Sequence, residues 1–255
     1  MVATAAISLL TLITLGVVVI VLVPVAAEDA LTHSQGFIGE SYDAYSWKCP
    51  NASGYGYNYE RFEMHVGEED FIESTRGGAL RQSTKLVSCP YIMVDPGDKY
   101  VQMVAQYLIG MTEGYSDEMR AQAALNFVQC AIWYEYDIDL YGTEDFWASP
   151  VETLYLHSGD CEDTSVLLCS IYLAMGYRCA MLDFPGHVAV GVYLGDSEDY
   201  LFCETTFDSP HGLGYGGFGS NGTPEVHDDF SGSLLTDISG FFAGYRNLIR
   251  SVTGA

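Results

Sequence analysis

Residues 164–175 form a mostly apolar run that leaves almost no polar face on a helix. Such a helix belongs inside a domain, because a helix that is apolar all round must be shielded from water. Asp160 is typical of an N-cap, and Glu162 and Asp163 suit a first helical turn. Gly176 directly follows the run and is typical of the C-terminal end of a helix. The pattern therefore predicts a buried helix with Cys161 at its N-terminus.

Three strand-like segments follow this helix, at residues 178–184, 187–193 and 200–206. A Pro-Gly break separates the first two, and a turn at 195–199 separates the second from the third. Short connections of this kind join antiparallel neighbours. We therefore expect an α+β fold in which the cysteine helix packs on an antiparallel sheet.

The second strand-like segment alternates small residues with valines. Period-2 geometry places His187, Ala189 and Gly191 on one face of the strand. We expect this face to lie against the cysteine helix, because small side chains let a helix approach closely. The intervening valines are then expected to face away from the helix.

Upstream of the cysteine, helical patterns dominate. Asp98 and Ser116 are suitable N-caps for helices over residues 99–111 and 117–136, and the second has apolar positions at i, i+3 and i+4 spacing. Residues 151–156 suit a short helix or turn just before the cysteine helix.

A cysteine, a histidine and a carboxylate occur in an order that suggests nucleophilic catalysis. Cys161 begins the buried helix, where backbone N–H groups and the helix dipole favour a thiolate, although neighbouring acidic side chains oppose it. His187 opens a strand, and Glu204 lies near the end of the next. Folding back at the turn brings them together as nucleophile, base and orienter. An ordinary buried cysteine is the alternative for the first, and His157 and Asp208 are the alternative base and orienter.

The chain resembles the transglutaminase-like superfamily of papain-like cysteine enzymes, above all its archaeal members, in the motifs GDCEDTSVLLCSIYLAMGY, PGHVAVGV and YLFCETT. The preceding SPVETLYLHSGDCED also matches that pattern, and the resemblance covers roughly residues 98–206. It implies a papain-like core with Cys161 as the nucleophile and His187 as the base. Glu204 stands where the family usually has an aspartate.

Together, the three residues and the resemblance imply a cysteine peptidase or amidase that attacks an amide carbonyl and forms a thioester. Release of the thioester by an amine instead of water would make the chain a protein-crosslinking transamidase. A cell-wall isopeptidase and a non-catalytic cell-surface scaffold are further alternatives. The expected substrate is a protein or peptide-like amide, and no cofactor is implied.

Residues 1–27 contain no charged side chain, and residues 5–23 are nearly all apolar. At about 1.5 Å per residue, a helix over this run is about long enough to cross the hydrocarbon core of a membrane. The small residues Val25-Ala26-Ala27 also fit a cleavage site, so a cleaved secretory signal is the alternative to a transmembrane anchor. Both alternatives predict a catalytic domain outside the cytoplasm. With an anchor the protein is a single-pass membrane protein, and with a cleaved signal it is secreted. The positive-inside rule leaves the orientation open, because no Lys or Arg is near either end.

We divide the rest of the chain into an extension at 28–96 and a catalytic domain at 97–255. Short strand-like pieces rich in Gly, Tyr and Asn predict a small β-rich layer or flap in the extension. In the catalytic domain, Trp147 lies on a loop and is a candidate wall of the substrate cleft, with a core-anchoring role as the alternative. A glycine-rich stretch follows Glu204, and residues 234–252 suit a final amphipathic helix.

The net charge of −24 argues against nucleic acid and anionic lipid headgroups as partners. Of the seven cysteines, the six besides Cys161 make an even number, which fits an oxidising compartment. Cys49 and Cys89 both precede a proline in the extension, and we expect a bridge between them. No cysteine or histidine spacing is typical of a zinc site, so no metal is expected.

Overall fold

The computed structural model describes residues 44–83, 93–216 and 222–230 of the chain. The fold of these residues is α+β, with small sheets among the helices. In chain order the elements are β1 (Ala44–Pro50), β2 (Tyr57–Glu63), α2 (Glu68–Ser83), α3 (Lys99–Met111), α4 (Asp117–Ala131), β3 (Trp133–Tyr134), α5 (Asp137–Leu140), α6 (Pro150–Leu156), β4 (Ser158–Gly159), α7 (Cys161–Ala174), β5 (Arg178–Phe184), β6 (His187–Tyr193), β7 (Leu201–Cys203) and β8 (Glu225–His227).

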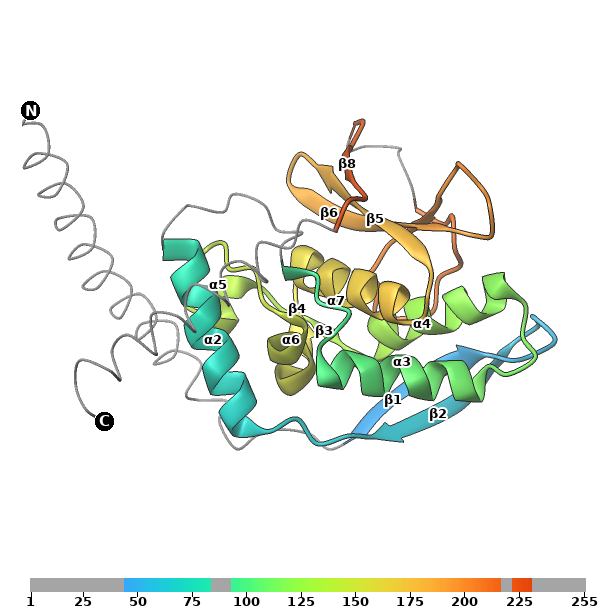
Figure 1. Ribbon diagram of the computed structural model, residues 1–255, viewed down its shortest axis with the longest axis horizontal. Helices are drawn as coiled ribbons and strands as arrows, with labels where there is room; N and C mark the ends of the chain where they lie inside the picture. Colours follow the sequence, from blue (N-terminus) through green and yellow to red (C-terminus); the bar gives the residue numbers. More distant parts are fainter. Residues whose placement is uncertain (1–43, 84–92, 217–221, 231–255) are drawn as a thin grey trace, which may run out of the picture.

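An antiparallel sheet with the strand order β7-β6-β5-β8 covers one side of helix α7. Phe184 pairs with His187 at the tight turn between β5 and β6, so the histidine stands at the edge where that hairpin closes. Helices α3 and α4 lie on the other side of α7, and the hairpin of β1 and β2 lies beyond them (Figure 1). Helix α7 is therefore enclosed between the sheet and the other helices.

Helix α7 is buried almost throughout, as its apolar run predicted. Val166, Leu167 and Leu168 are all fully buried. Gly176 follows the helix with φ of +88°, a conformation that glycine adopts without strain and that turns the chain towards β5. Asp160 occupies the N-cap as predicted, but its side chain makes no capping hydrogen bond.

The face of β6 that meets α7 is the opposite of the one predicted. Val188 and Val190 belong to the main core cluster with α7, whereas Ala189 belongs to a second cluster on the other face. The buried valines Val188, Val190 and Val192 fill the space between helix and sheet. Gly191 is needed on the other face, because a Cβ atom there would lie 2.7 Å from the ring of Tyr200.

Helix α4 ends earlier than the predicted helix over 117–136. It stops at Ala131, and Trp133 and Tyr134 form strand β3, which runs parallel to β4. The Trp133 N–H donates to the carbonyl oxygen of His157 at 2.7 Å, and this pairing with a distant segment overrides the helical pattern. Strand β8 was also not predicted; it lies in the glycine-rich stretch and pairs with β5.

The hairpin of β1 and β2 shares its core with the rest of the described residues. Tyr45 and Trp47 of β1 are buried and contact the ring of Phe127 in α4, with centroids 5.6 and 5.2 Å from it. Helix α2 follows the hairpin, so the extension contributes a helix as well as strands. The boundary at residue 97 therefore does not separate two hydrophobic cores within the described residues.

Several predictions concern segments beyond the described residues. The expected anchor at 1–27, the final helix at 234–252 and Cys89 all lie outside them. Within the described residues, no helix is long and apolar enough to cross a membrane. Cys49 is a buried free thiol in the structure, contrary to the predicted bridge with Cys89.

Candidate active site

Side-chain hydroxyl groups tie the start of α7 to the sheet. The Oγ1 atoms of Thr164 and Thr205 lie 2.8 Å apart, and Ser165 Oγ donates to the carbonyl oxygen of Val188 at 3.2 Å. Each of these four residues lies between one and four positions after a predicted site residue. The helix with the cysteine, the strand with the histidine and the segment with the carboxylate therefore meet at one place.

His187 and Glu204 form a hydrogen-bonded pair, with 2.9 Å between His187 Nε2 and Glu204 Oε2. Their side chains are only 19% and 13% exposed. The other oxygen, Glu204 Oε1, accepts bonds from the N–H and the hydroxyl of Thr206. Burial raises the pKa of Glu204, but the bonds from His187 and Thr206 outweigh burial and hold that pKa below its ordinary value. Glu204 is therefore an ionised acceptor that orients the imidazole ring.

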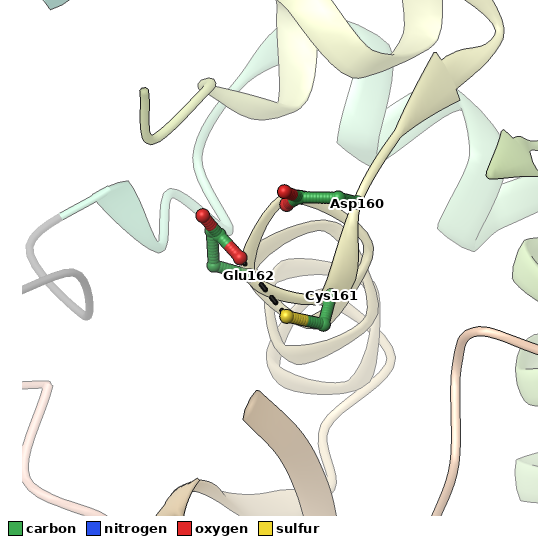
Figure 2. A group of neighbouring side chains, drawn as sticks. All are labelled: Asp160, Cys161 and Glu162. Carbon is green, nitrogen blue, oxygen red and sulfur yellow. Dashed lines mark hydrogen bonds between the residues drawn. The ribbon is translucent and has the colours of Figure 1, made fainter. Parts of the chain in front are cut away.

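Cys161 is the first residue of α7, and its thiol donates a hydrogen bond to Glu162 Oε2 at 3.0 Å (Figure 2). The sulfur also lies within hydrogen-bonding reach of the backbone of Val188, the residue after His187. Burial, followed by the negative charge of Glu162 and its bond to the thiol, raises the pKa of Cys161. The structure therefore holds a thiol, whereas the helix N-terminus alone favours a thiolate.

The alternative site residues make other contacts than the His187–Glu204 pair. The ring of His157 stacks on that of Tyr45, with centroids 4.0 Å apart. Asp208 is exposed, and the carboxylate that meets the His187 ring is Glu204. Trp147 is partly buried against the core, and its Nε1 donates to Asp145 at 2.9 Å. The paired imidazole and carboxylate are thus the two residues expected from strand order.

A cavity and two exposed aromatic side chains lie in the β3 and β4 region, and β4 directly precedes the cysteine helix. The cavity has a volume of about 460 Å³, and its lining includes Trp133, Glu135 and Ser158 from the β3 and β4 region. Tyr134 lies close enough to Cys161 that burial and then the charge of that cysteine raise the pKa of the tyrosine. Trp133 and Tyr134 were predicted to lie within a helix, so their place beside the cysteine helix was not expected. The available signal was that neither belongs to the apolar stripe of that helix.

Carboxylates gather around the start of α7. Ligand atoms of Asp137, Asp160 and Asp163 lie within 4.8 Å of one another, and so do those of Asp137, Asp145 and Glu162. Burial, with neighbouring carboxylates, raises the pKa of Asp137 and that of Asp160 to about 8. Clusters of carboxylate oxygens suit hard cations such as Ca²⁺ or Mg²⁺. The sequence showed no such site, because its members come from separate segments.

No family model and no curated protein matches this chain. The thiol of Cys161 bonds to Glu162, and its helix packs on the strand that begins with the carboxylate-bonded imidazole of His187. A cysteine, an imidazole and a carboxylate on such neighbouring elements are the residue types that acyl transfer through a thioester uses.

Proposed function

We propose that this chain is a cysteine hydrolase of the transglutaminase-like, papain-like type, and that it cleaves an amide bond in a protein or peptide-like substrate. The observation that carries the proposal is the 2.9 Å pair of His187 and Glu204 beside the helix that begins with Cys161. An imidazole that is held at one nitrogen is oriented to exchange a proton at the other. That is the requirement for a general base next to a nucleophile.

The proposed reaction uses the two ring nitrogens of His187 differently. Because Nε2 is bonded to Glu204, Nδ1 is left to accept the proton of the Cys161 thiol. The sulfur attacks the amide carbonyl carbon, the C–N bond then breaks, and the imidazolium gives its proton to the leaving amine. Water attacks the resulting thioester with the same histidine as base, which releases the acid and restores the thiol.

Because of the hydrogen bond from Cys161 to Glu162, the proposed proton transfer takes place only after the substrate has bound. The raised pKa of Cys161 keeps the sulfur protonated in the resting enzyme. The thiol must therefore leave Glu162 Oε2 and pass its proton to the imidazole when the substrate is bound. Activation of the nucleophile is then coupled to the attack on the carbonyl.

Two donors can stabilise the negative oxygen of the tetrahedral intermediate. The backbone N–H of Cys161 lies at the N-terminus of α7, where N–H groups have no partner in the helix. The hydroxyl of Tyr134 is the second donor in this proposal, since its ring lies on β3 next to the cysteine. A donor of this kind acts on the transition state more than on the bound substrate.

Tyr134→Phe is therefore expected to lower kcat for a fluorogenic peptide amide about 10- to 100-fold, with little change in KM. The matched control is Tyr136→Phe, because Tyr136 is 61% exposed and its ring contacts that of Tyr134 at 5.3 Å. The control should keep kcat. A rise in KM at unchanged kcat for Tyr134→Phe would instead assign this hydroxyl to substrate binding.

A peptidyl acyloxymethyl ketone tests the proposal directly, because it alkylates cysteines that a base activates. The full-length chain should form one adduct, which peptide mapping places on Cys161, and Cys161→Ala should form none. Labelling should be at least about 100-fold slower in His187→Ala. Labelling of Cys49, Cys169, Cys179 and Cys203 should be low, since these four cysteines are buried. Equal labelling rates in wild type and His187→Ala would reject the proposed role of the histidine.

A further inference from the structure

Three aspartates from two elements converge next to the cysteine, in a part of the structure that the proposed hydrolysis does not use. Asp137 begins α5, Asp160 is the N-cap of α7, and Asp163 lies in the first turn of α7. Their side chains have one ligand atom each within 4.8 Å of the others. Asp137 is 1% exposed, Asp160 9% and Asp163 0%, so the cluster is shielded from water.

Each of these carboxylates has a buried oxygen without a hydrogen-bond partner. The atoms are Asp137 Oδ1, Asp160 Oδ1 and Asp163 Oδ2. The other oxygens of two of them are fixed by backbone groups, because Asp137 Oδ2 accepts from the Phe146 N–H and Asp163 Oδ1 from the Ala148 N–H. The side chains are thus held in place while one oxygen of each stays unsatisfied.

Buried polar atoms in proteins are nearly always satisfied, so three such oxygens in one cluster call for a missing partner. Within the described residues, no lysine or arginine forms an ion pair with any of the three aspartates. Burial of like charges without a counter-charge is strongly unfavourable. A cation or bound protons can supply the compensation, and the two can be distinguished by experiment.

We propose that Asp137, Asp160 and Asp163 bind a calcium ion that joins α5 to the start of α7. Calcium takes oxygen ligands at about 2.3–2.6 Å, so ligands on opposite sides of the ion lie about 4.6–5.2 Å apart. One ligand atom of each aspartate lies within 4.8 Å of the others, which fits that span. Magnesium, at about 2.0–2.1 Å, requires a tighter set and retains more of its water.

The ion would fix the segment around the nucleophile without taking part in the reaction. Asp160 and Asp163 lie on either side of Cys161 and Glu162 in sequence, and Asp163 also anchors the loop that contains Ala148. One ion therefore ties together the start of the cysteine helix, the α5 turn and the loop before α6. This site is independent of the proposed hydrolysis.

Calorimetric titration and thermal unfolding of the full-length chain, stripped with EDTA, test this site with CaCl₂. We expect one Ca²⁺ per chain, and at a hundredfold excess over Kd a rise in Tm of about 5–10 °C. MgCl₂ should bind at least about tenfold more weakly. The absence of Ca²⁺ binding would overturn the proposal and would mean that protons neutralise the cluster.

Asp163→Asn and Asp137→Asn should each weaken Ca²⁺ binding at least about tenfold and remove most of the rise in Tm. Both amides keep an oxygen that can accept the existing backbone bonds, so the variants should fold, and without Ca²⁺ their Tm should match or exceed that of wild type. The matched control is Asp139→Asn, an exposed position on the same short helix, which should keep the full response. Undiminished Ca²⁺ binding in both test variants would place the ion elsewhere and overturn this assignment.

Discussion

Cys161→Ala and His187→Ala are each expected to reduce amide turnover about a thousandfold or more, and the double variant should lose little beyond either one. The two residues act as one unit in the proposed reaction, because the histidine is needed only to move the proton of that thiol. Losses within such a unit are far from additive. Steady-state hydrolysis of a fluorogenic peptide amide by the four proteins measures this directly.

Variants at neighbouring positions show whether the loss is specific. Glu204→Gln should cost less than His187→Ala, because an amide oxygen still holds the ring but no longer stabilises the imidazolium by charge. Glu204→Asp should be tolerated best, with the shorter side chain lengthening the 2.9 Å contact. His157→Gln should keep turnover, since that ring stacks on Tyr45, whereas the carboxylate Glu204 holds the ring of His187. If His157→Gln and not His187→Ala abolished turnover, the base would be misassigned.

The elements around the candidate site were predictable because their patterns are local. Helix α3 and strands β5 and β6 have the expected bounds, and α7 begins at the expected cysteine. A cap followed by an apolar period, or a Pro-Gly break between two apolar runs, depends on a few neighbouring residues. The pairing of His187 with Glu204 followed from the order of the strands and the turn between them.

Other features depend on residues far apart in the chain. Alternation along β6 has two solutions, and the choice between them depends on where Tyr200 packs against Gly191. The raised pKa of Cys161 depends first on its burial, which only the assembled fold determines. The end of α4 depends on the pairing of Trp133 with His157, and no local pattern records that contact. The acidic cluster likewise requires α5 to approach α7.

The shared core makes a strong prediction about the extension. Phe127 of α4 is fully buried and contacts Tyr45 and Trp47, which both belong to β1. Phe127→Ala should therefore lower the free energy of unfolding of the whole described fold by about 3–5 kcal/mol, since it removes a core ring and leaves a cavity. In a chain of this size the expected fall in Tm is about 6–20 °C, measured by calorimetry or circular dichroism.

Tyr59→Ala is the matched control on the same hairpin, because Tyr59 is 82% exposed and its loss should change stability by less than about 0.5 kcal/mol. Wild type and Phe127→Ala should each unfold in one transition, because β1, α4 and α7 belong to one core cluster. A separate low-temperature transition in Phe127→Ala, with the main transition unmoved, would show that the hairpin is an independent unit. In that case residues before 97 would form a layer on the catalytic domain, as the sequence division assumed, and would not be part of its core.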